Sequence, residues 1–153
     1  MKAVLLISIC CIAGVWFHPH SESIDSFYDK YKPLEKVDKQ TQLYWVKKLT
    51  NGIYDRDEMK KLLDQPSKLK IVILGEEQIE QKDIDALKLG LKKDDLDKLI
   101  SVREENEQFD FYLKSIDKEK THLVYLVEED GDFIFMSLLD EWSLKDLLQS
   151  KRL

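Results

Sequence analysis

The sequence predicts an α+β fold: an antiparallel sheet with a C-terminal four-strand meander, and helices packed mainly on one face. Apolar residues recur at helical spacing through most of the first two thirds of the chain. In the last third, short apolar runs are separated by polar turns, which is typical of consecutive strands. Asp130-Gly131 stands between two such runs and is a strong hairpin signal. With 153 residues and no repeat or linker, the chain is expected to form one domain.

The N-terminus has the pattern of a secretory signal peptide. Met1-Lys2 is followed by an apolar stretch at residues 3–17 and a polar switch at His18. We expect residues 1–23 to be cleaved and residues 24–153 to form the exported domain, with the mature chain beginning near Ile24. The apolar stretch is shorter than the roughly 20 residues of a membrane-spanning helix. An uncleaved anchor and a buried first helix are the alternatives.

Both cysteines, Cys10 and Cys11, lie inside this signal segment. A mature domain without thiols excludes disulfides and cysteine catalysis. The alternative is that Cys10 or Cys11 is a lipid-attachment site, although Ile9 stands where a small residue is usual. The predicted location is therefore the periplasm or the cell exterior, with lipid anchoring as the alternative.

Helices are predicted wherever apolar residues share one helical face. Pro33 ends the first helix, because proline disfavours a helical residue before it. The apolar run at residues 69–74 is β-branched, ends at Gly75, and is predicted as a strand buried on both faces that joins one sheet edge in an undecided direction. The expected helices cover residues 26–31, 38–51, 55–63 and 84–91, with a very short one at 96–100.

The meander is predicted from strands at residues 100–103, 109–114, 123–127 and 133–139. The hairpin at Asp130-Gly131 sets a register that pairs Glu128 with Phe133 and Leu126 with Phe135. In the strand at 109–114, alternation predicts one buried face. The opposite face, with Asp110, Tyr112 and Lys114, is expected to point outward.

A last helix is predicted at residues 143–148. Ser143 can cap its start and Asp146 can complete a capping box three residues later. Trp142 can pack on Leu147 as a hydrophobic staple.

Composition argues against nucleic acid and membrane surfaces as partners. The formal net charge is −6, and it is unchanged by removal of the signal segment because Lys2 and Glu22 cancel. Acidic and basic residues alternate, whereas nucleic-acid binders cluster their cations. No basic amphipathic stretch suggests docking on anionic lipid.

No catalytic, metal-binding or cofactor-binding residue is predicted, and no cofactor. His122 is the single histidine of the predicted mature chain, and it is expected at a strand surface. Glu128, Glu129, Asp130 and Asp132 lack the spacing of a calcium loop and are expected to be a charged hairpin tip. A nucleophile elbow is missing, and isolated glycines form no phosphate loop.

Four features follow a known family pattern: the signal segment, residues 26–31, residues 99–104 and above all residues 123–138 leading to 144–147. On these features the chain resembles the domain of unknown function 4252 family of exported envelope proteins in the Bacteroidetes. Two departures are Asp140-Glu141 in place of a glycine, and a less apolar segment at residues 35–42. The resemblance implies an exported α+β domain, often lipidated, and carries over no activity.

The function expected from the sequence is therefore a noncatalytic envelope domain that binds another protein or a surface component. A small hydrolase using paired carboxylates is the runner-up, because carboxylates are abundant. Tyr112 is the one candidate for a binding surface, since tyrosine is enriched at interfaces. The competing interpretation of Tyr112 is packing against a neighbouring strand or a covering helix.

Overall fold

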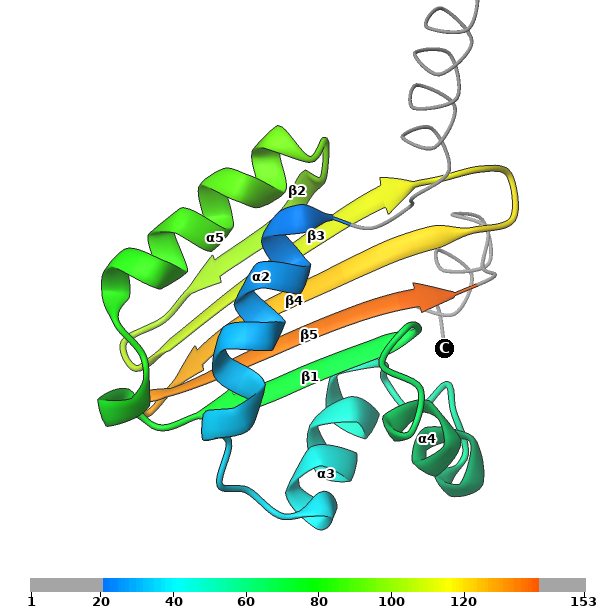
Figure 1. Ribbon diagram of the computed structural model, residues 1–153, viewed down its shortest axis with the longest axis horizontal. Coiled ribbons are helices and arrows are strands. Elements are labelled where there is room, and N and C mark those ends of the chain that lie inside the picture. The colour runs from blue at the N-terminus through cyan, green and yellow to red at the C-terminus, as the bar shows by residue number, and fades with distance from the viewer. Residues whose placement is uncertain (1–20, 141–153) are drawn as a thin grey trace, which may run out of the picture.

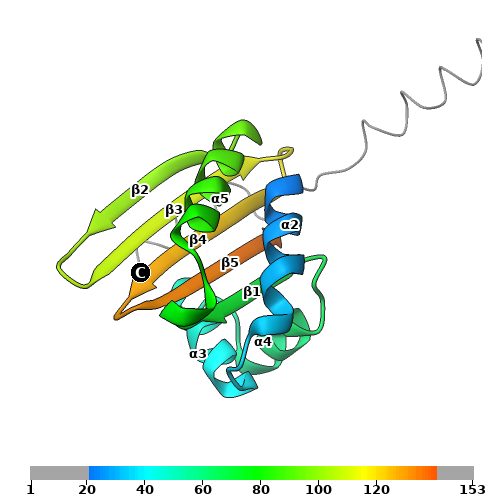
Figure 2. The same cartoon turned by 60° about the vertical axis from the view of Figure 1, so that its left-hand side comes forward.

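The computed structural model describes residues 21–140, in which five strands form one antiparallel sheet in the order β1-β5-β4-β3-β2. Helices α2 and α5 lie across one face of the sheet, and α3 and α4 lie near β1 (Figures 1 and 2). The predicted α+β class and C-terminal meander are confirmed. The predicted signal peptide, apart from residues 21–23, and the predicted helix at residues 143–148 fall outside the described residues.

The first described helix, α2 (Glu22–Tyr31), starts four residues earlier than predicted and leads into a 3-10 turn, η1 (Lys32–Leu34). Its N-cap is Ser21, whose Oγ accepts a hydrogen bond from the Ile24 amide at 3.3 Å. A serine in this position satisfies an amide that has no partner within the helix. The folded unit therefore includes residues that the predicted cleavage after Ser23 would remove.

Helices α3 (Lys39–Leu49) and α4 (Arg56–Leu63) form where they were predicted. Asp38 caps α3 through the Thr41 amide at 2.8 Å. Asp55 and Glu58 form a reciprocal capping box at the start of α4. Asn51 and Gly52, with φ of 55° and 72°, provide the left-handed turn between the two helices.

Strand β1 (Leu69–Leu74) lies at one edge of the sheet, as expected, and pairs antiparallel with β5, which settles its direction. A 3-10 turn, η2 (Glu76–Gln78), then leads to α5 (Gln81–Lys93).

The short helix predicted at residues 96–100 is wrong, because β2 (Asp97–Arg103) occupies this segment. Helix α5 ends in a Schellman motif, with Asp95 in the left-handed region at φ 63°. The Leu96 amide donates to the Leu91 carbonyl at 3.0 Å and the Asp95 amide donates to the Lys92 carbonyl at 3.2 Å. This motif turns the chain out of the helix, so the apolar residues that follow continue as a strand.

The remaining strands are β3 (Glu107–Ser115), β4 (Thr121–Glu129) and β5 (Asp132–Asp140). The predicted hairpin between β4 and β5 is confirmed, with positive φ at Asp130 (51°) and Gly131 (86°). The predicted register is also confirmed: Glu128 pairs with Phe133 and Leu126 pairs with Phe135.

Apolar side chains form a core on each face of the sheet. On one face, residues of α2 and α5 pack on alternate residues of β1, β3, β4 and β5. On the other face, α3 and α4 extend the core with Trp45, Val46, Met59 and Leu62. No helix within residues 21–140 has the length and apolar character needed to cross a membrane.

The expectation that Asp110 and Tyr112 point outward is wrong. Their exposed fractions are 1% and 3%, because they lie on the face that α2 and α5 cover. Strand β3 is therefore buried on both faces through its central residues.

Candidate functional site

A pocket of about 600 Å³ opens at the end of the sheet, lined by the β2–β3 turn, the β4–β5 hairpin and the start of α5. We call it the acidic pocket. Residues of η2, α5, both turns and the adjoining strands line it: Glu76, Ile79, Gln81, Ile84, Arg103, Glu104, Glu105, Asn106, Glu107, Gln108, Glu128, Gly131, Asp132 and Phe133.

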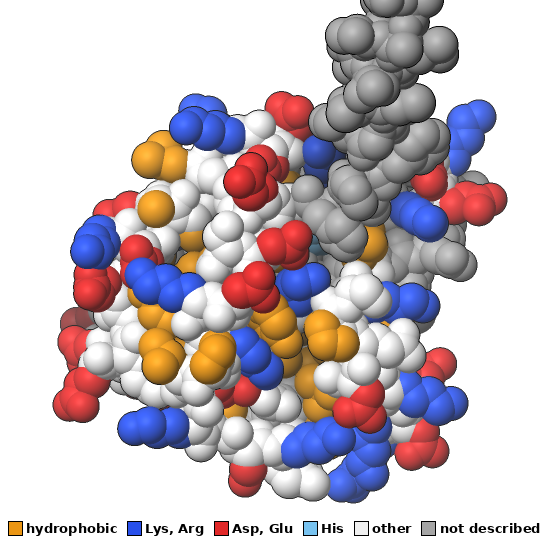
Figure 3. All heavy atoms as spheres, viewed as in Figure 1, with side chains coloured by type: hydrophobic (Ala, Val, Ile, Leu, Met, Phe, Trp, Pro, Cys, Tyr) orange, Lys and Arg blue, Asp and Glu red, His pale blue; other side chains and the backbone are white. Residues whose placement is uncertain are grey.

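Carboxylates dominate the lining of the acidic pocket. Six of its residues are acidic and only Arg103 is basic. Ile79, Ile84 and Phe133 contribute apolar surface to it. In Figure 3, acidic side chains line the lower left edge, where Figure 1 places the two turns. This combination suits a ligand that has a positive charge and some apolar surface.

Backbone hydrogen bonds hold the two turns together. Glu104 and Glu107 exchange amide-to-carbonyl bonds of 2.8 and 3.4 Å across the β2–β3 turn. The Asp130 amide then donates to the Asn106 carbonyl at 3.1 Å, which ties the hairpin tip to that turn. The rim of the acidic pocket is therefore fixed by main-chain contacts.

Glu128 contributes a carboxylate oxygen with no partner among residues 21–140. Its Oε1 is buried and accepts no hydrogen bond there. Glu128 lies on β4 between Gln108 of β3 and Phe133 of β5, and all three residues line the acidic pocket. An unsatisfied buried carboxylate oxygen is costly, and a ligand donor would remove that cost once rotation of the Glu128 side chain turns the oxygen toward the pocket.

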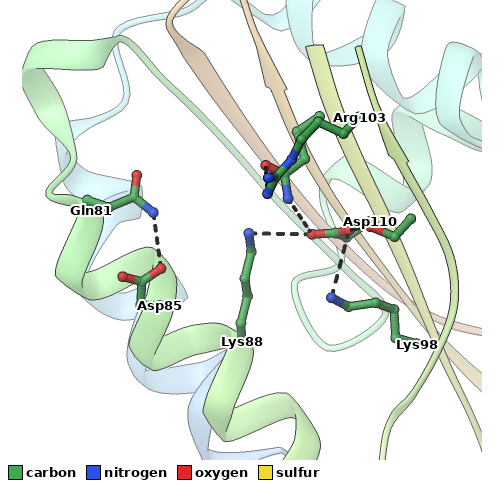
Figure 4. A network of polar contacts seen from close by, with 8 residues as sticks. Gln81, Asp85, Lys88, Lys98, Arg103 and Asp110 are labelled. Atoms are coloured by element: carbon green, nitrogen blue, oxygen red, sulfur yellow. Dashed lines mark hydrogen bonds and ion pairs between the residues drawn. The ribbon is translucent and has the colours of Figure 1, made fainter. Parts of the chain in front are cut away.

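A buried ionic network adjoins the acidic pocket (Figure 4). Asp110 accepts a hydrogen bond from Ser101 Oγ at 2.6 Å and lies 3.4 Å from Lys88 Nζ of α5 and 4.0 Å from Lys98 Nζ of β2. Gln108 Nε2 also donates to Asp110 at 3.3 Å, and Gln108 accepts from Arg103. Gln108 and Arg103 both line the acidic pocket, so they connect it to this network.

The environment of Asp110 keeps the carboxylate charged. Burial acts to raise its pKa, but the Ser101 hydrogen bond and the charges of Lys98 and Lys88 outweigh burial and hold the pKa below its ordinary value. Asp110 therefore belongs to a structural ionic network and is a poor proton donor.

Tyr112 does not form a binding surface. It packs in the core beneath α2 and α5, and burial, with the nearby charge of Asp110, raises its pKa to about 12. Packing against a covering helix was the competing interpretation of this residue, and the structure favours it.

The prediction that His122 lies at a strand surface is wrong. The side chain is 6% exposed, and its Nε2 lies 2.7 Å from Ser137 Oγ on β5. The adjoining space measures about 10 Å³, the lower limit for one water molecule, which leaves no room for a substrate. The His122–Ser137 pair is therefore a buried structural contact.

The acidic residues of the β4–β5 hairpin differ in their surroundings. Glu128 and Asp132 line the acidic pocket, whereas Glu129 lies 3.7 Å from Lys48 Nζ of α3. Across residues 21–140, no group of three or more His, Cys, Asp or Glu side chains is placed to hold a metal ion.

Sequence reasoning missed the acidic pocket because its carboxylates come from three separate segments. The predicted hairpin register already placed Glu128 opposite Phe133, which is confirmed. The contact between Asp130 and Asn106, which brings the second acidic turn beside the hairpin, had no sequence signal.

Residues 35–149 match the family described as Domain of unknown function (DUF4252). The chain belongs to this family. The match covers α3 through β5 and therefore every residue that lines the acidic pocket of this DUF4252 domain. No curated protein and no solved structure matches the chain.

Proposed function

We propose that this DUF4252 domain is an exported, noncatalytic component of the cell envelope that binds a lysine or arginine side chain of a partner protein in the acidic pocket. The observation that carries the proposal is the buried, unpartnered Oε1 of Glu128 in a pocket with six carboxylates and one arginine.

The size and lining of the acidic pocket support a protein ligand. A volume of about 600 Å³ exceeds that of one side chain, so part of the adjoining backbone would also enter. Ile79, Ile84 and Phe133 can contact the aliphatic stem of a lysine or arginine. The ammonium or guanidinium group at the end of that stem can donate to Glu128.

Export is supported by the apolar stretch at residues 3–17, which precedes the polar residues before Ser21. The capped start of α2 at Ser21 places the folded unit directly after that segment. Periplasmic or extracellular location is part of the proposal, with lipid attachment at Cys10 or Cys11 as the alternative.

Binding can be tested by NMR titration with acetylated, amidated trilysine. We expect chemical-shift changes confined to residues 76–84, 103–108 and 128–133, which weaken as salt is added. A variant with Glu104→Lys and Glu105→Lys should lose the response. Asp57→Lys with Glu119→Lys changes net charge equally at exposed sites outside the pocket and should retain it.

Crosslinking in intact cells should then capture one envelope protein on the unmodified chain. The control variant should capture the same protein, and the Glu104→Lys, Glu105→Lys variant should not. Equal responses of the two variants would contradict the proposal. A screen of glycosides and esters tests the hydrolase alternative: turnover that disappears in Glu128→Gln would make the domain an enzyme.

A further inference from the structure

The two edges of the sheet differ in how their backbone groups are satisfied. At the β1 edge, Lys32 Nζ donates to the Ile71 carbonyl at 2.9 Å, and the Ile73 amide donates to Glu35 Oε2 at 2.8 Å. Lys32 and Glu35 also form an ion pair of 2.8 Å. These side chains occupy the groups that another strand would need, so the β1 edge is closed to strand addition.

The β2 edge has no comparable cover among residues 21–140. Every residue of β2 is exposed. Within residues 21–140, no backbone group on its outer side is hydrogen-bonded to the main chain. An edge of this kind can accept another strand.

The β2–β3 pairing determines which backbone groups point outward. Glu104 and Glu107 exchange both amide-to-carbonyl bonds, and such pairs alternate with non-bonded pairs along an antiparallel ladder. Val102 and Ile100 are therefore bonded inward to β3, opposite Phe109 and Phe111. Ser101 and Arg103 present their amides and carbonyls to the outer side.

Apolar side chains are exposed beside these outward groups. Leu99, Ile100 and Val102 are 52%, 38% and 45% exposed. The register shifts between Lys98 and Ile100, so the regular part of the edge begins at Ile100 and ends at the turn residue Glu104. Val102 is the centre of this regular segment, and Ser101 and Arg103 flank it symmetrically.

We propose that the β2 edge binds a second copy of this chain, antiparallel, with Val102 on the twofold axis. In this register the amide and carbonyl of Ser101 form hydrogen bonds with the carbonyl and amide of Arg103 in the second copy. The twofold axis repeats the same pair of bonds on its other side. The two Val102 side chains face each other as a non-bonded pair. The two sheets become one continuous sheet across the axis.

The charges along β2 favour this antiparallel arrangement. Lys98 lies at one end of the strand beside Asp97, and Glu104 and Glu105 lie at the other end beside Arg103. The antiparallel pairing brings Lys98 beside the acidic turn of the second copy, whereas a parallel pairing would place like charges together. Strand pairing at the β2 edge requires no ligand in the acidic pocket.

The oligomeric state tests the proposal. Analytical ultracentrifugation over a concentration series should give twice the chain mass for the unmodified protein, and hydrogen exchange should show protected amides at Ser101 and Arg103. Val102→Lys should give a monomer and release both amides, because it places two lysines face to face. Leu89→Lys makes the same change at an exposed position on α5 and should remain dimeric.

A cysteine substitution tests the register. Non-bonded antiparallel pairs have Cα atoms about 4.5 Å apart, within disulfide range. Val102→Cys should therefore form a crosslinked dimer on mild oxidation, and Leu89→Cys should not. A protein that is monomeric at every concentration, or a dimer that Val102→Lys leaves intact, would overturn the proposal.

Discussion

At the scale of single residues, Asp110 illustrates how a charge can be kept in a protein interior. Its side chain is 1% exposed, yet Ser101, Lys88 and Lys98 all contact the carboxylate. A buried charge without such partners would be neutralised or would destabilise the fold. The network also connects α5 to β2 and β3, so it fixes the helix over the sheet.

Replacing Asp110 should reduce the loss of folding free energy that the protein shows as the pH falls below about 4. The folded-state pKa of Asp110 is below its ordinary value, so its charge stabilises the fold above about pH 4, and this contribution is lost as the pH falls through the folded-state pKa. Asp110→Asn should lower the free energy of unfolding by about 1–3 kcal/mol at pH 7. The difference should shrink below pH 4. Urea denaturation at pH 7, 4 and 3 measures it, with the exposed Glu119→Gln as control.

Replacing Tyr112 should cost stability rather than binding. Its ring packs beneath α2 and α5, so Tyr112→Ser should lower the free energy of unfolding by about 3–5 kcal/mol. Tyr112→Phe keeps the ring and should cost much less. Thermal denaturation of the two variants separates these effects. A Tyr112→Ser protein as stable as the parent would show that the packing described above is not formed.

At the scale of secondary-structure elements, the contact between α2 and α5 depends on one glycine. A Cβ built on Gly90 would lie 2.5 Å from Ser23 Cβ and closer still to Ser23 Oγ. Two helices approach this closely only where one of them lacks a side chain. Gly90 is therefore retained inside a helix despite its low helix propensity.

Gly90→Ala should destabilise the protein by up to about 2 kcal/mol. Overpacking against Ser23 costs about 1–3 kcal/mol and outweighs the gain of about 1 kcal/mol in helix propensity. Adding Ser23→Gly should remove the clash, so a double-mutant cycle in chemical denaturation should give a favourable coupling. Gly75→Ala, whose nearest contact would be 3.7 Å, is the matched control and should be near neutral. Additive effects of Gly90→Ala and Ser23→Gly would argue against the contact.

The elements that local signals define were predicted well. Asp38, Asp55 and Asp130-Gly131 each mark a cap or turn through their own backbone contacts, and the α3, α4 and hairpin predictions are confirmed. The segment at residues 96–100 was predicted wrongly. The apolar spacing of this segment fits either a helix or a strand. Asp95 has the left-handed backbone conformation that glycine usually takes, and it ends α5 so that the following residues form β2.

At the scale of the whole molecule, burial depends on which helix lies over which strand, and sequence alone does not provide this. Alternation in β3 correctly assigned Phe111 and Leu113 to the interior but placed Asp110 and Tyr112 in solvent. The two helices that cover their face are separated from β3 along the chain, and no local pattern reveals that arrangement. The acidic pocket escaped prediction for the same reason, because tertiary contacts assemble it.

The start of the folded unit bears on where an exported chain would be cut. Ser21 is buried, caps α2 and donates to Asp94 Oδ2 at the C-terminal end of α5, and Ser23 packs on Gly90. A mature chain beginning near Ile24 would lose all of these contacts. Loss of a serine cap alone costs about 0.5–2 kcal/mol.

If the chain is exported as proposed, we therefore expect the mature protein to retain Ser21. Cleavage before this residue leaves the α2 cap and the Ser23–Gly90 contact intact, whereas cleavage after Ser23 does not. Intact-mass measurement of protein from an envelope fraction locates the first residue, and a diacylated mass beginning at Cys10 or Cys11 would also satisfy the expectation. Chains produced with Ser21 or with Ile24 as the first native residue provide the comparison, and the shorter one should melt at a lower temperature. A natural mature chain that begins at Ile24 and is as stable as the longer one would show that the cap and the helix contact contribute nothing.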